Sequence, residues 1–291
     1  MTHPALRVIV AGLTLLPASM RQLPAGATTC AAPSATPQVS GAALQTARAT
    51  LARCVREDLH AGRWRNAADR LSRAQQAGAI LREADRRAWQ ALVARLDATR
   101  QVDGGQWTTL IDAVMPHEEA LPWVGPLVRG VAAARASWSR QDTALQARAR
   151  AELVRLDRLA RTAGALSDAE LARLLVQGAI AGAQYERDEM QLLLEAAHDL
   201  EMRLVAGDEL QVPVVLATEL EADLLRLTDR YAAASERYRD LLVEWPLRVQ
   251  SRVGLADAYR RLGSAREAEA ALAEARDLWA SADAEAKAQI K

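Results

Sequence analysis

Residues 214–279 read VVLATELEADLLRLTDRYAAASERYRDLLVEWPLRVQSRVGLADAYRRLGSAREAEAALAEARDLW, and within this stretch the chain repeats itself. When the stretch is shifted so that Ala222 falls on Ala256, other small or apolar residues also coincide. The coinciding pairs include Leu225 with Tyr259, Ala234 with Ala268, Tyr238 with Leu272 and Leu241 with Ala275. A fixed period of about 34 residues is typical of stacked helix pairs. It predicts an architecture and a function based on binding, but it does not name a partner.

The composition of the whole chain favours helices. Alanine makes up about a fifth of the 291 residues, and only 15 glycines and 10 prolines occur. Apolar residues recur at helical spacing from Gly41 onward, first in two hairpins at 41–78 and 80–114. Ser167-Asp168-Ala169-Glu170 is a capping box, which predicts that a helix starts there. We therefore expect an all-α protein of about twelve helices in six hairpins.

Two units within residues 214–279 resemble the tetratricopeptide repeat, a family whose unit is two antiparallel helices with small residues where they cross. In the second unit the matching residues are Gly254, Leu255, Ala256, Tyr259, Gly263, Ala268, Leu272 and Ala275. In the unit before it they are Ala222, Leu225, Tyr231, Ala234, Tyr238 and Pro246. Glu221 and Arg252 depart from the pattern, which usually has leucine and an aromatic residue there. Residues 48–74 resemble a third, looser unit. The resemblance implies a right-handed superhelical solenoid with a concave binding face.

The predicted organisation divides the chain into seven parts. In order they are a signal peptide (1–27), a flexible linker (28–40), N-terminal hairpins (41–115), a proline-rich connector (116–126), irregular hairpins (127–212), the repeat pair (213–280) and a frayed tail (281–291).

The resemblance also implies which residues line the concave face, because first-helix side chains do so in the family. By position these are Glu219, Asp223, Arg226 and Leu227, followed by Gln250, Asp257, Arg260 and Arg261. This surface carries charges of both signs, unlike the Lys, Asn and Arg set with which family members clamp a terminal carboxylate. We predict that the charged residues of this set bind a partner protein, and that the chain is not a carboxylate-clamp co-chaperone.

The connector is a second candidate for recognition. Pro116, Pro122 and Pro126 forbid a continuous helix, and Trp123 lies among them. Loops often carry recognition, and tryptophan is enriched at binding hot spots, so Trp123 is a predicted partner contact. The alternative is a structural linker in which Trp123 caps the adjacent core.

The N-terminal segment, residues 1–27, has the features of a secretory signal. Arg7 precedes an apolar run at 8–16, and Ala25-Gly26-Ala27 offers a cleavage site. We expect a periplasmic or otherwise exported protein without a membrane span after cleavage; the alternative is an apolar N-terminus on a cytosolic protein. In an oxidising compartment Cys30 and Cys54 can form a disulfide, whereas a buried apolar thiol at Cys54 is the alternative.

Charge and motifs argue against several classes of function. The 37 basic and 37 acidic residues leave no net charge, so a nucleic-acid partner has no electrostatic support. Glu57 with His60 and Glu195 with His198 have the Glu-x-x-His spacing of di-iron bundles, but the additional carboxylates such a site needs are not apparent, so we expect no metal and no cofactor. Motifs of hydrolases and nucleotide-binding proteins are absent from the sequence.

The predicted function is that of a non-catalytic scaffold or adaptor of the bacterial cell envelope, which binds another protein during the assembly or operation of a complex. The alternative is a permanent structural subunit of a larger complex. An enzyme with an unfamiliar site is a third, more distant possibility.

Overall fold

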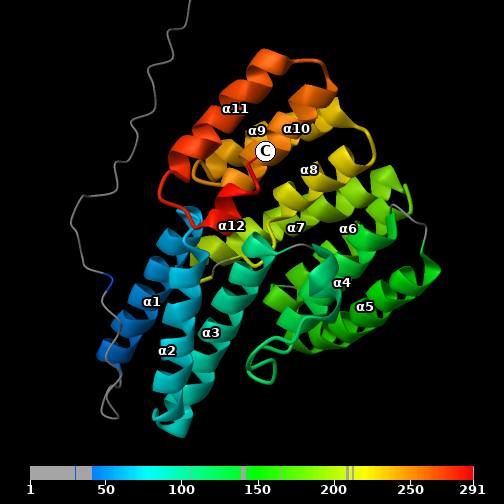
Figure 1. The fold of residues 1–291 in the computed structure, drawn as a ribbon. Helices are drawn as coiled ribbons and strands as arrows, with labels where there is room; N and C mark the ends of the chain where they lie inside the picture. The colour runs from blue at the N-terminus through cyan, green and yellow to red at the C-terminus, as the bar shows by residue number, and fades with distance from the viewer. Residues whose placement is uncertain are drawn as a thin grey trace, which may run out of the picture. The chain divides into compact units, whose positions relative to one another are not determined.

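The computed structural model describes residues 30, 41–105, 107–138, 142–164, 166–207, 210–211 and 213–290. By its contacts the chain divides into two units, Met1–Ala31 and Ala32–Lys291, and of the first unit only Cys30 is described. The predicted signal peptide and most of the predicted linker therefore lie outside the described residues. In the second unit the regular structure is helical, without a strand among the described residues, so the all-α prediction is confirmed (Figure 1).

Twelve α-helices and one 3₁₀ helix follow one another along the described part of the chain. They are α1 (Ala42–His60), α2 (Trp64–Ala79), α3 (Glu83–Gly104), η1 (Trp107–Asp112), α4 (Val124–Trp138), α5 (Thr143–Ala163), α6 (Asp168–Ala183), α7 (Arg187–Gly207), α8 (Ala217–Leu227), α9 (Tyr231–Glu244), α10 (Val249–Arg261), α11 (Ala265–Leu278) and α12 (Ala284–Lys287).

The helices of the predicted repeats follow the predicted period. Helix α11 begins and ends one full period after α9, and α10 ends one full period after α8. The alanines that recur at this spacing are Ala222, Ala234, Ala256 and Ala268, and each is at most 1% exposed. Because their side chains are small, the paired helices can approach closely where these residues meet.

The start of α6 also follows the sequence. The Ser167 side chain accepts a hydrogen bond from the Glu170 backbone N–H at 3.2 Å, which satisfies one of the amide groups left unpaired at a helix start.

Two segments differ from their predictions. Trp107–Asp112 is a short 3₁₀ helix and not the second α-helix of a hairpin. Pro116 disfavours helical conformation at Met115, so the segment does not continue as a helix into the connector. Helix α4 begins at Val124, so Pro126 lies in its first turn and not in the connector. Proline is tolerated there because the first backbone N–H groups of a helix have no partner within it.

The predicted frayed tail is packed against the N-terminal hairpin. Trp279 is 1% exposed, its ring meets that of Trp64 edge-on at 5.6 Å, and its Nε1–H donates to the His60 carbonyl at 2.9 Å. The Asp283 N–H donates to the Gly62 carbonyl at 3.0 Å. Gly62 turns the chain at φ 67°, where a Cβ would lie 2.6 Å from Ala282. Ala282 and Ala286 are therefore buried in the core at the end of the chain, and Figure 1 shows α12 beside the α1–α2 turn.

A glycine on α10 allows a second close approach. A Cβ on Gly254 would lie 2.4 Å from the Tyr238 ring, which is fully buried. Intrinsic helix propensity alone predicts that Gly254→Ala stabilises the protein by about 1 kcal/mol. We expect the opposite sign, a loss of about 1–3 kcal/mol, because the buried ring has no space to move into. Urea unfolding measures the difference, and a stabilised variant would contradict the close approach.

Candidate functional site

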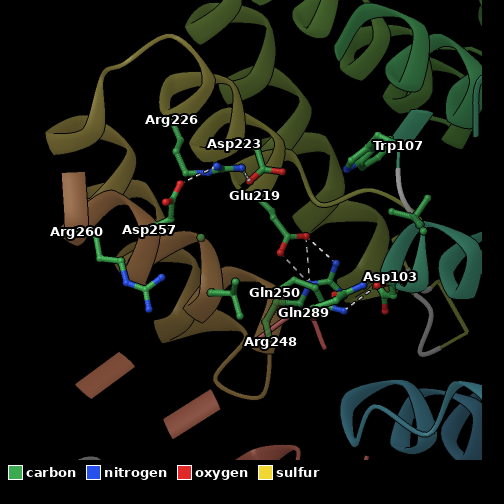
Figure 2. A pocket seen from close by; sticks show the side chains of 14 residues that line it. Asp103, Trp107, Glu219, Asp223, Arg226, Arg248, Gln250, Asp257, Arg260 and Gln289 are labelled. Atoms are coloured by element: carbon green, nitrogen blue, oxygen red, sulfur yellow. Dashed lines mark hydrogen bonds and ion pairs between the residues drawn. The ribbon is translucent and has the colours of Figure 1, made fainter. Parts of the chain in front are cut away.

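A pocket lies between the end of α3, η1, α8 and α10, with Gln289 from the C-terminal segment at its edge (Figure 2). Its volume is about 390 Å³ and it opens to solvent. Two groups of ion pairs line it, one around Arg248 and one around Arg226.

Arg248 joins three helices. Its guanidinium is 2.5 Å from the Asp103 carboxylate on α3 and 2.6 Å from the Glu219 carboxylate on α8. The Ser251 hydroxyl donates to the same Glu219 carboxylate at 2.6 Å. Burial raises the pKa of Asp103, and Arg248 offsets part of that effect. Burial lowers the pKa of Arg248, but Asp103 and Glu219 outweigh it, so that the net shift is upward and the guanidinium stays charged.

The second group is centred on Asp223 and Tyr238. Arg135 from α4 lies 2.7 Å from the Asp223 carboxylate, and the Tyr238 hydroxyl donates to the same carboxylate. Arg226 donates to the Tyr238 hydroxyl at 3.3 Å and to Asp257 at 2.9 Å. Burial alone would raise the pKa of Asp223, but Arg135 and Arg226 lower it, so this carboxylate is ionised.

One basic residue of the pocket is only loosely held. The Arg260 side chain is 43% exposed, and its ion pair, to Glu269, is 3.7 Å long. Glu269 is at the same distance from Arg276, so the two arginines share one acid. The acids of the pocket pair with other arginines, which leaves Arg260 as the side chain best placed to meet a negative group from outside.

The structure brings most of the predicted concave residues together. The predicted contacts that line the pocket are Glu219, Asp223, Arg226, Asp257 and Arg260, with Gln250 beside them. Arg261 does not line it; its guanidinium lies over the Tyr231 ring at 5.9 Å. Leu227 lines a neighbouring hollow. The prediction that these residues bind a partner stays a prediction.

Sequence reasoning missed one wall of the pocket. Asp103 and Trp107 come from the N-terminal half, and Gln250 donates to the Asp103 carbonyl at 3.2 Å across 147 positions of sequence. No local pattern signals a contact over that separation. Gln289 was missed because the tail was expected to fray.

Trp123 lies inside the protein. Its side chain is 8% exposed, and the Arg95 guanidinium sits 5.0 Å from the centre of its ring. Arg95 in turn is held by Asp168 at 2.5 Å and 3.1 Å. A ring enclosed in this way is not offered to a partner, so we do not propose Trp123 as a contact. Its position fits the alternative in which the ring caps the core beside the connector.

The residues of the two Glu-x-x-His pairs lie in different surroundings. Glu195 pairs with Arg237 at 3.2 Å, whereas His198 lies 3.2 Å from the Thr218 hydroxyl and 3.6 Å from Glu244. Burial, with Arg248 and Arg56, lowers the pKa of His60 to about 4, so this imidazole is neutral at pH 7. Among the described residues, neither His60 nor His198 belongs to a group of three or more side chains that could hold a metal ion.

Cys54 is 3% exposed on α1, and neither cysteine is a free thiol. The pairing of Cys30 with Cys54 stays a prediction. The mass of the intact protein tests it, because reduction of a disulfide adds about 2 Da.

Glu201, on α7, is a buried acid with a raised pKa. It is 2% exposed and accepts the Ala217 N–H at 2.9 Å. Burial, together with Glu244 and Glu219, raises its pKa to about 8, against an ordinary value of 4.5. The folded protein therefore binds the proton more tightly than the unfolded chain, and stability falls as the pH rises from 4.5 to 8.

We expect the free energy of unfolding to fall by about 2 kcal/mol from pH 6.5 to pH 9, and Glu201→Gln to remove this fall. Most of the effect of His60, whose lowered pKa makes stability fall as the pH drops from 6.5 to 4, lies below this window, and the remainder is common to both proteins. Urea unfolding of both proteins at the two pH values measures the effect. Parallel pH dependences would contradict the assignment.

Comparison with protein-family models, with curated proteins and with solved structures finds no match. Within the described residues, no helix is both long and apolar enough to cross a membrane.

Proposed function

We propose that the chain is a non-catalytic interaction scaffold of the bacterial cell envelope, with a tetratricopeptide-like, right-handed solenoid that binds a segment of a partner protein. The observation that carries the proposal is the pocket against α8 and α10. There the first helices of two units with a common period contribute Glu219, Asp257 and Arg260 to one solvent-open wall. The signal-like residues 1–27 support the proposed export.

The pairing of charges supports binding over catalysis. Asp103 and Glu219 are bound to Arg248, and Asp223 and Asp257 are bound to other arginines. A general acid or base needs a carboxylate that can exchange a proton with a substrate. Acids held in ion pairs by internal arginines are better suited to shaping a rigid surface.

Arg260 is the residue through which to test binding, because Arg226 is committed to the buried network and its substitution would disturb the fold. The tagged full chain and its Arg260→Glu variant are used to capture partners from envelope extracts, and each captured protein is then tested with purified components. We expect Arg260→Glu to weaken binding by about tenfold, the size of one reversed charge contact.

Arg276→Glu is the matched control. Arg276 is 52% exposed and shares Glu269 with Arg260, but it does not line the pocket. Binding should be unchanged in this variant. If Arg260→Glu and Arg276→Glu retain the same partners with the same affinity as the original chain, the pocket is not the binding site and the proposal fails.

A further inference from the structure

An apolar hollow adjoins the charged pocket. It lies among η1, α4, α5 and α8 and has a volume of about 630 Å³. Its apolar lining residues are Trp107, Ile111, Ala136, Trp138, Leu145 and Leu227. Exposed apolar hollows lined by aromatic side chains are typical of sites that receive an apolar group from a partner.

Trp107 belongs to both the hollow and the pocket. The Arg135 guanidinium lies 4.7 Å from the centre of its ring, and Arg135 is itself fixed by Asp223 at 2.7 Å. The indole is therefore held in place by the same ion-pair network that shapes the pocket. An aromatic side chain fixed before binding loses little conformational freedom when a partner packs against it.

Arg260, on the side of the pocket away from Trp107, favours a ligand that carries a negative charge. Figure 2 shows Trp107 and Arg260 on opposite sides of the pocket, with the paired acids between them. Each of those acids pairs with an arginine other than Arg260, whereas Arg260 is 43% exposed and 3.7 Å from its partner Glu269. Its guanidinium is therefore the positive group of the pocket that an acidic group of a ligand can best reach. The pocket and the hollow each fall within the range of about 300–1,000 Å³ of sites for compact ligands, which suits a few residues of peptide.

We propose that the site recognises a short linear peptide in which an apolar side chain accompanies an acidic one. The apolar side chain enters the hollow beside Trp107, and the acidic side chain pairs with Arg260. This inference rests on the proposed function and adds the chemistry of the partner. The apolar and the acidic side chain bind to different parts of the surface, so a substitution can remove the preference for one without removing the preference for the other.

The experiment selects random ten-residue peptides displayed on phage against the full chain and its variants. Ala136→Trp fills the hollow from α4, and Thr108→Trp fills it from an exposed position at its edge, in case the first variant does not fold. Arg260→Glu reverses the charge, and Arg276→Glu is the matched control. Circular dichroism and thermal unfolding confirm that each protein is folded.

We expect the original chain and Arg276→Glu to enrich peptides with a large apolar residue close to Asp or Glu. The filled-hollow variants should lose the apolar preference and keep the acidic one, whereas Arg260→Glu should replace Asp and Glu with Lys and Arg. A synthetic copy of the best peptide should bind about tenfold more weakly to Ala136→Trp and to Arg260→Glu.

The outcomes separate this inference from the proposed function. If the binding of the selected peptides depends on Arg260 but not on the hollow, the inference is overturned and the scaffold proposal stands. If no peptide is enriched over a surface without the protein, or enrichment is independent of both positions, both are overturned. A dimer by analytical ultracentrifugation that Ala136→Trp dissociates would mean that a second copy occupies the hollow, which also overturns the inference.

Discussion

Replacing Trp279 by alanine is expected to lower the free energy of unfolding by about 3–5 kcal/mol, one of the largest effects of any single substitution in this chain. The side chain is 1% exposed, packs edge-on against Trp64 and donates to the His60 carbonyl at 2.9 Å. Alanine leaves a cavity between α11 and the α1–α2 turn. It also removes the packing beside the hydrogen bond from the Asp283 N–H to the Gly62 carbonyl. The first and last described helices would then be held together by fewer contacts.

Chemical unfolding of Trp279→Ala and Trp279→Phe measures this effect in two steps. Phenylalanine keeps most of the apolar burial but lacks the indole N–H, so it should cost about 1–2 kcal/mol. Val243→Ala is the control, because Val243 is 84% exposed and its truncation should change stability by less than about 0.5 kcal/mol. A loss below about 1 kcal/mol for Trp279→Ala would mean that the C-terminal segment is not packed as described.

Replacing Arg248 by methionine should cost about 3–5 kcal/mol, because it leaves Asp103 and Glu219 buried without their partner. The Arg248 and Asp103 side chains are only 11% and 3% exposed, and their charged groups are 2.5 Å apart. With Arg248 gone, the pKa of Asp103, already raised by burial, should rise further. The loss of stability should therefore be larger at pH 8 than at pH 4, where Asp103 takes up a proton without penalty.

A nearby arginine provides the matched control. Arg252 lies one turn later on α10 and is 13% exposed, but its partner Glu274 is 67% exposed and keeps its contact with water when unpaired. Arg252→Met should therefore cost no more than about 1 kcal/mol. The triple variant Asp103→Asn, Glu219→Gln, Arg248→Met should recover part of the loss, since neutral groups need no buried counter-charge. Equal losses for Arg248→Met and Arg252→Met would contradict the role of the buried network.

Much of the helical framework follows from local pattern. Helix α11 begins and ends one full period after α9, as the repeat predicts, and α6 starts where the Ser167 side chain accepts from the Glu170 backbone N–H. These features depend on residues within a few turns of one another, so a linear pattern is enough to predict them. The same reasoning placed several first-helix residues, Glu219 and Asp257 among them, along one face.

The surroundings of each tryptophan depended on the tertiary structure. Trp123 was predicted to contact a partner, but it is only 8% exposed. Trp279 precedes the tail that was predicted to fray, and it is 1% exposed. Trp107 was predicted within a hairpin, and it lines the pocket. An indole suits a core and an interface equally well, because it combines a large apolar body with one polar group. The sequence pattern around a tryptophan does not distinguish the two.

The sequence by itself determined that the chain is helical and, to within a few residues, where the helices between residues 217 and 278 begin and end. Only the tertiary structure decided that Asp103 and Trp107 line the same pocket as Glu219 and Asp257, and that Gln289 lies at its edge. The reason is physical: helix periodicity acts over a turn of the chain, whereas the approach of Asp103 to Arg248 is set by the packing of all the helices between them.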